Sequence, residues 1–136
     1  MIELSNTNAQ VIPAGQSVIF DKILLHTGCA ECSMPNSGFI GLTQRNAIYE
    51  ISFNGNIGAT TAGGTAQVAI TFSGAPLLET TSKTISTAAG DLQNISASTF
   101  VKTCCFGMGG TVLLTNTGTA DLNFDANGRI SVKRIA

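Results

Sequence analysis

The sequence is poor in charge, and this scarcity limits the partners that it is expected to bind. Charged residues make up 11% of the 136 residues and the formal net charge is -1, whereas soluble domains average about 25% charged residues. No basic patch interleaved with aromatic residues is present, so nothing points to a nucleic-acid partner. Apolar residues still make up 43%. We therefore expect a folded chain whose surface is rich in hydroxyls and amides, or is partly covered by other subunits.

Aromatic residues and histidine are also scarce. The chain has no tryptophan and one tyrosine, which counts against a sugar-binding platform of stacked rings. It has one histidine, His26, whereas a cupin-like metal oxygenase needs several histidine ligands. No paired carboxylates or nucleophile motif accompany His26 in sequence, so we interpret it as an ordinary strand or loop residue. We expect no enzymatic activity, no catalytic residues and no cofactor.

Long apolar runs are missing as well. No segment approaches the roughly 20 apolar residues that span a bilayer, so no membrane partner is expected. The start of the sequence, Met1–Asn6, lacks the basic and apolar regions of a secretory signal. The sequence therefore predicts synthesis in a host cytoplasm without a signal peptide.

In place of helical periodicity, the sequence has short β-branched and aromatic runs separated by turn residues. The clearest, Ala47–Ile57, alternates apolar and polar residues as a half-buried strand does. We predict an all-β antiparallel sandwich of about ten strands in one domain, residues 11–136, preceded by an N-terminal arm, residues 1–10. An immunoglobulin-like sandwich would show similar alternation. The other predicted strands are Gln10–Ile12, Ser17–Phe20, Lys22–Leu25, Gly38–Thr43, Thr65–Ser73, Leu77–Thr81, Lys83–Thr87, Leu92–Cys105, Gly110–Asn116, Leu122–Phe124 and Gly128–Ile135.

The four cysteines form two pairs, Cys29 with Cys32 and Cys104 with Cys105. Small buried or loop thiols, a structural zinc site and a disulfide formed in an oxidising medium all fit them. A redox pair would need a helix start, which the pattern lacks. Adjacent cysteines in an extended segment point to opposite faces, so at most one of the second pair is expected to approach the first. Asn94-Ile95-Ser96 matches a glycosylation acceptor, which we interpret as coincidence without a secretory signal.

Four segments, in this order, resemble complement globular heads and tumour necrosis factor-like domains. Tyr49–Asn56 is similar to their aromatic central strand, and Gln67–Leu77 to the hairpin that follows it. Gly110–Asn116 and Arg129–Ala136 resemble their penultimate and closing strands. The resemblance extends to the bacterial and phage versions, which include the C-terminal domain of a collagen-like spore exosporium glycoprotein and short proteins of gut Firmicutes phages. The phage proteins carry a similar Cys-Cys before the penultimate strand.

The resemblance implies a ten-stranded jelly roll that forms a tight homotrimer and buries one sheet face around the threefold axis. It predicts a structural virion protein of a tailed bacteriophage, either a head decoration or a fibre-tip module. The arm, residues 1–10, would anchor it to the capsid. Loops Thr60–Gly64 and Thr80–Gly90 would face solvent or a host surface. The alternative is a receptor- or glycan-binding head on a bacterial or spore surface. No collagen-like Gly-x-y repeat precedes the domain, which weakens the exosporium interpretation.

Overall fold

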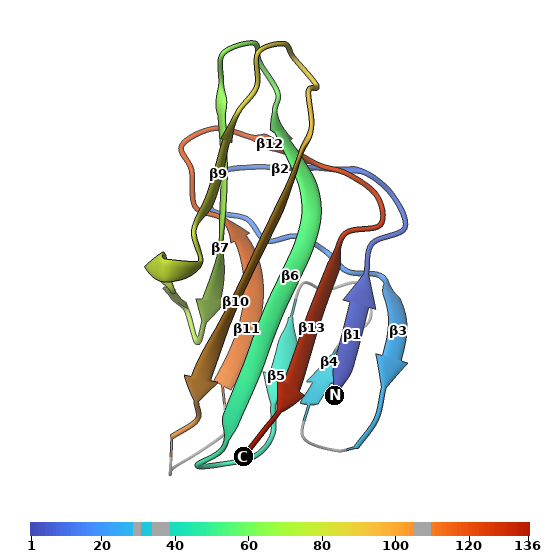
Figure 1. Ribbon diagram of the computed structural model, residues 1–136, viewed down its shortest axis with the longest axis vertical. Coiled ribbons are helices and arrows are strands. Elements are labelled where there is room, and N and C mark those ends of the chain that lie inside the picture. Colours follow the sequence, from blue (N-terminus) through green and yellow to red (C-terminus); the bar gives the residue numbers. More distant parts are fainter. Residues whose placement is uncertain (29–30, 34–38, 105–109) are drawn as a thin grey trace.

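The computed structural model describes residues 1–28, 31–33, 39–104 and 110–136, and the regular secondary structure in this part of the chain is β-strand apart from one 3-10 turn (Figure 1). Two antiparallel sheets face each other, which confirms the predicted fold class. Within the described residues no helix is long and apolar enough to cross a membrane. The strands are β1 (Ile2–Ser5), β2 (Gln10–Ile12), β3 (Lys22–His26), β4 (Glu31–Ser33), β5 (Ile40–Leu42), β6 (Ile48–Ala59), β7 (Thr65–Phe72), β8 (Ala75–Pro76), β9 (Ser82–Ile85), β10 (Gln93–Lys102), β11 (Gly110–Asn116), β12 (Leu122–Phe124) and β13 (Arg129–Arg134).

The first sheet, which we call sheet A, is organised around the long strand β6. One side of β6 pairs with β10 along ten residue pairs. Its other side pairs with β13 in its first half and with β12 near its end. β1 lies between β13 and β3, and β2 continues outward from β12. The second sheet, sheet B, has the order β4-β5-β11-β7, and both β8 and β9 pair with the free side of β7.

Alternation along β6 places the core between the sheets. Tyr49, Ile51, Phe53 and Ile57 point inward and are almost fully buried, which confirms the pattern predicted for this segment. They belong to a single apolar cluster to which both sheets contribute. The hydroxyl of Tyr49 accepts a hydrogen bond from the backbone N–H of Gln44 at 3.2 Å. The even-numbered residues of β6 therefore face out of the sandwich.

The start of the chain belongs to the sandwich and is not a separate arm. Ile2–Ser5 forms β1, with β13 on one side and β3 on the other. Ile2 and Leu4 are buried in the core. This four-residue segment is a strand because β13 and β3 present partner edges on both sides, and its own sequence is too short to show alternation. Ile2–Ser5 is therefore part of sheet A, and anchoring to a capsid through residues 1–10 stays a prediction.

Two other segments differ from the predicted strands. Leu77–Thr81 contains a 3-10 turn, η1 (Leu78–Thr80), because the hydroxyl of Thr80 donates to Leu77 O at 2.7 Å and accepts from Ile70 N at 2.9 Å. This hydroxyl takes the place of a strand partner for β7. In Ser17–Phe20, Ser17 makes an isolated bridge to Thr115 and no full strand forms. Within the predicted loop Thr80–Gly90, β9 (Ser82–Ile85) corresponds to the predicted strand Lys83–Thr87.

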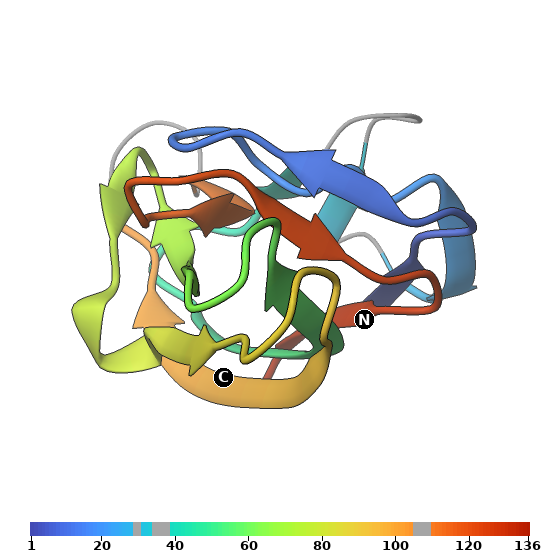
Figure 2. The ribbon, with the colours of Figure 1, turned by 90° about the horizontal axis from the view of Figure 1, so that it is seen from above.

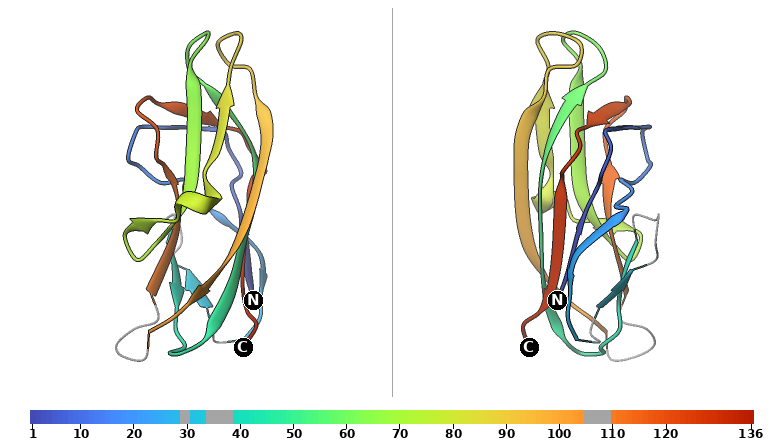
Figure 3. Two further views of the ribbon diagram at one scale, coloured as in Figure 1. Left: turned by 60° about the vertical axis from the view of Figure 1, so that its left-hand side comes forward. Right: turned by 90° about the vertical axis from the view of Figure 1, so that its right-hand side faces the viewer.

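The molecule has two distinct ends. The chain termini lie near one end, and the β6–β7 and β9–β10 loops form the tips at the other (Figures 1 and 3). Figure 2 looks down on these tips. Residues 60–64 form one tip, as predicted, and the other is held by Asp91, whose carboxylate accepts hydrogen bonds from Thr87 Oγ1 and Ala88 N.

Candidate functional site

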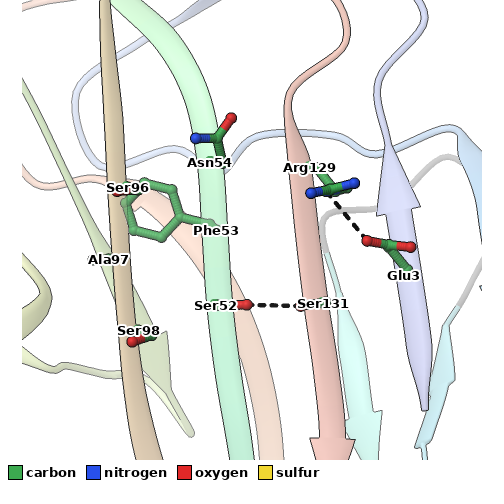
Figure 4. Close-up of a pocket in the computed structure, with 9 residues that line it drawn as sticks. All are labelled: Glu3, Ser52, Phe53, Asn54, Ser96, Ala97, Ser98, Arg129 and Ser131. Carbon is green, nitrogen blue, oxygen red and sulfur yellow. Dashed lines mark hydrogen bonds and ion pairs between the residues drawn. The ribbon is translucent and has the colours of Figure 1, made fainter.

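A polar groove crosses the outward face of sheet A (Figure 4). Its volume is about 440 Å³. Four strands build it: β10, β6, β13 and β1. The lining residues are Glu3, Ser52, Phe53, Asn54, Ser96, Ala97, Ser98, Arg129 and Ser131. The floor is therefore made mostly of hydroxyl and amide side chains that the strand alternation turns away from the core.

Strand register brings three serines into one row across the groove. Ser98 pairs with Ser52, and Ser52 pairs with Ser131. The hydroxyls of Ser52 and Ser131 lie 2.7 Å apart and share a hydrogen bond. Because the side chains at these adjacent positions of three strands are small, they rise less far from the sheet than longer side chains would. Another protein surface or a ligand could thus approach the sheet closely here.

An ion pair closes one side of the groove. Arg129 Nε lies 3.2 Å from Glu3 Oε1, joining β13 to β1. The Arg129 side chain is 59% exposed and the Glu3 side chain 21%. Such exposed pairs contribute little to stability, typically about 0–1 kcal/mol. The pair serves mainly to hold the guanidinium over the groove, where its remaining N–H groups can donate to an incoming acceptor.

Apolar residues lie at both edges of the same sheet. Phe100, on β10, is 63% exposed and lies in one row with Glu50 and Lys133. At the opposite edge all five residues of β3 are exposed. Leu25, which is 42% exposed, pairs with the outward-facing Glu3, whereas Ile23 pairs with the buried Leu4 and so lies on the core side of the sheet. The outward face thus has a low polar centre between two apolar edges. Exposed apolar groups gathered on one face are characteristic of protein contact surfaces.

The predicted cysteine site is left open by the structure. Cys29 and Cys105 lie outside the described residues, and Cys32 lies in β4, where its side chain is not described. Cys104, just after β10, is exposed. Among the described residues no group of three or more His, Cys, Asp or Glu could hold a metal ion. Zinc, disulfide and plain-thiol states of these four residues stay predictions.

The other residues singled out in the sequence have ordinary structural positions. His26 ends β3, and its Nε2 lies 3.0 Å from the backbone oxygen of Glu31. Asn94 donates its amide to Asn56 Oδ1 at 3.0 Å. Ser96, two residues on, is the only part of the glycosylation pattern that lines the groove.

The groove itself was missed by sequence reasoning. Its serines and the Glu3–Arg129 pair come from segments far apart in the chain. Two features of the sequence could have indicated the groove. They are the polar residues that alternate with apolar ones along each strand, and the resemblance of the segment order to a known fold.

Comparison with known proteins supports the fold. No family model and no curated protein matches the sequence. Among solved structures, the globular domain of zebrafish complement 1qA protein superposes with a TM-score of 0.68 at 11% identity, covering 99% of this chain and 96% of that one. Murine APRIL at pH 5.0 superposes with a TM-score of 0.64 at 11% identity, covering 97% and 98%.

Both superpositions run through nearly the whole chain, so they settle the choice left open between an immunoglobulin-like sandwich and a jelly roll. The identities are too low to carry anything beyond architecture. The chain has the two-sheet antiparallel jelly-roll fold shared by the complement 1q globular domain and the tumour necrosis factor-like protein APRIL.

Proposed function

We propose that this chain forms a homotrimer through the outward face of sheet A and serves as a structural protein on the virion of a tailed bacteriophage. The role would be that of a head decoration or a fibre-tip module, without catalysis. The observation that carries the trimer is the outward face itself, with its low polar centre and its two exposed apolar edges. The virion role is supported by the resemblance of the sequence to short phage proteins.

The arrangement of apolar residues favours a ring over a twofold dimer. Phe100 lies at the β10 edge and Leu25 at the β3 edge, on opposite sides of one sheet. A head-to-tail contact would bring the β10 edge of one copy onto the β3 edge of the next, and such a contact closes into a ring when the rotation allows it. That the ring would contain three copies is inferred from the resemblance to trimeric tumour necrosis factor-like domains. A closed ring would also cover the free edge of β3, which otherwise invites aggregation.

The two ends of the molecule would then have different roles. The end that carries the chain termini would face the particle, and the tips at residues 60–64 and 86–92 would point outward toward solvent or a host surface (Figure 1). Because β1 is built into the sheet, capsid contact would come from the surface of this end rather than from a free arm.

A second candidate is a receptor- or glycan-binding head on a bacterial or spore surface. The observation that favours it is the groove of about 440 Å³ lined by serines, Asn54 and the Glu3–Arg129 pair, since sugars are bound by such hydroxyl, amide and charged groups. The two candidates make opposite demands on this face. A trimer built on it covers the groove, whereas a ligand site needs the groove open.

Substitution of Phe100 tests the trimer. Burial of the exposed 63% of this ring, roughly 125 Å², would contribute about 3 kcal/mol at each contact. Phe100→Ser should therefore shift the chain from trimer to monomer in light scattering, with little change in the folded state of each protomer. Ile85→Ser is the matched control, because Ile85 is 58% exposed but lies on β9, which pairs with β7 in sheet B. Equal effects of the two substitutions, or none from Phe100→Ser, would refute this interface.

Localisation separates the two functions. Antibodies against the purified protein should label phage particles isolated from the source culture. Labelling of the bacterial or spore surface in place of particles would favour the second candidate. Direct binding of the wild-type protein to a glycan panel, lost on Arg129→Gln, would support the same alternative.

A further inference from the structure

Two Asn-Gly dipeptides occur in the chain, Asn54-Gly55 and Asn127-Gly128, and this pair of residues has a characteristic chemistry. The backbone nitrogen of the glycine can lose its proton and attack the side-chain carbonyl carbon of the asparagine. A new C–N bond forms as the bond to the amide nitrogen breaks, and ammonia leaves with the proton. Water then opens the cyclic imide to aspartate or isoaspartate. Glycine allows this best because it has no side chain to hinder the approach.

The fold treats the two dipeptides differently. Asn54 and Gly55 lie inside β6, where Asn54 is paired with Ser96 on one side and with Arg129 on the other. The extended ladder holds their backbone on both sides. Asn127 is exposed in the turn between β12 and β13, with φ of 65°. A turn is where cyclisation of an Asn-Gly pair is normally least hindered.

In this turn, however, both backbone nitrogens of the pair are bound by one residue, Asn6. Gly128 N donates to Asn6 Oδ1 at 2.8 Å, and Asn127 N donates to the backbone oxygen of Asn6 at 2.8 Å. The first of these nitrogens is the nucleophile of the reaction. To attack, it must release its hydrogen bond and turn toward the Asn127 side chain.

Asn6 is itself fixed in one orientation. It is 1% exposed, and its Nδ2 donates to Asn8 O and to Asp125 O, each at 2.9 Å. The nitrogen of this carboxamide donates to two carbonyl oxygens, and its oxygen accepts from one N–H. A flip of the carboxamide would exchange donor and acceptor and so break all three hydrogen bonds. A buried and fully bonded group of this kind holds its partners firmly.

We propose that Asn127 is a latent deamidation site of this protein and that Asn6 keeps it unreacted in the folded state. Conversion at Asn127 would place a carboxylate two residues before Arg129 at the start of β13, and the isoaspartate product would also add a methylene to the backbone. Because Arg129 stands over the groove, the state of Asn127 is coupled to the geometry of the outward face of sheet A.

Peptide mass spectrometry after incubation in mildly alkaline buffer tests the proposal at both dipeptides of each sample. Asn6→Ser removes the acceptor for Gly128 N together with the two bonds that Asn6 Nδ2 donates. Loss of the bond on Gly128 N, the nucleophile, is expected to speed deamidation of Asn127 about tenfold. Asn54 in the same sample is the internal control and should stay at its wild-type rate. In denatured wild-type protein both asparagines should react fast. A folded Asn6→Ser protein with an unchanged rate at Asn127 would overturn the proposal.

A second measurement needs no variant. The amide hydrogen of Gly128 in the wild-type protein should exchange with solvent slowly, as a bonded and buried N–H does. Fast exchange at Gly128, with neighbouring strand amides protected, would equally overturn the role given to Asn6.

Discussion

Gly128 is expected to be required because of a neighbouring ring and not because of its own backbone angles. Its φ is not among the positive values of the chain. A Cβ placed on it would lie 2.6 Å from Cζ of Phe124, and closer still to Cε1. Phe124 is fully buried and meets Phe20 edge to face, with ring centroids 6.2 Å apart. The ring therefore has no free space into which to move.

Gly128→Ala should cost about 2–3 kcal/mol of unfolding free energy, the usual range for forcing an extra methyl into a packed core. Leucine lacks the far ring atoms that meet this methyl, so Phe124→Leu should relieve most of the clash, at its own cost of roughly 1–2 kcal/mol. In that background Gly128→Ala should cost less than about 1 kcal/mol. A small residual cost is expected because Asn6 Oδ1 would lie 3.0 Å from the new carbon.

Urea unfolding of the four proteins, at one protein concentration, measures this coupling as a double-mutant cycle. Gly15 is the matched control, since its φ is +81° and no atom lies within 4 Å of an added Cβ. Gly15→Ala should cost about 1 kcal/mol in both backgrounds because the strain is in its own backbone. If Gly128→Ala costs the same with Phe124 as with leucine, the ring is not the reason for the glycine and the packing argument fails.

Burial raises the pKa of Tyr49 above 10.0, so stability should be intact below pH 10.0 and fall as the pH rises above it. Because Tyr49 is the chain's one tyrosine and no tryptophan is present, its ultraviolet titration reports this residue alone, and a midpoint at 10.0 would contradict the burial. Hydrogen bonds from Thr7 hold the pKa of Asp21 below 3.8. The stability that these bonds contribute should be present above pH 3.8 and be lost as the pH falls below it. Thermal unfolding at a series of pH values checks this, because the Asp21→Asn variant should lack this pH-dependent contribution. Asn116 is fully buried and its amide donates to the carbonyls of Ile12 and Ala120. Asn116→Ala should therefore lower the unfolding free energy, measured in urea, by about 2–4 kcal/mol. A loss below about 1 kcal/mol would show that water replaces these bonds.

The parts of the fold that could be predicted were those with strong local signals. Gly110–Asn116 and Leu122–Phe124 are strands with the predicted bounds, because turn residues flank clear alternation. β6 was predicted within two residues at its C-terminal end for the same reason. The described residues form more than ten strands because β1, β4 and β8 have no counterpart among the predicted strands.

What could not be predicted depends on contacts between distant segments. β1 is too short to be periodic, and its strand character comes from β13, more than a hundred residues away. Ser52 and Ser131, 79 positions apart, meet only because β6 and β13 pair in one register. The basic residues Arg129 and Lys133 lie on a strand in the middle of sheet A for the same reason. Composition showed that the surface is polar, but it could not show which strands place that polarity together.

The proposed assembly rests on association through the outward face of sheet A, and the solution mass of the wild-type protein decides it. Light scattering on a sizing column, with and without a reducing agent, should give a mass near three times 14.0 kDa in both conditions. That result would support a trimer held by surface burial without disulfides. A mass of 14.0 kDa in both conditions would contradict the trimer, leave the groove and the apolar edges open to solvent, and make the surface-binding head the function to pursue.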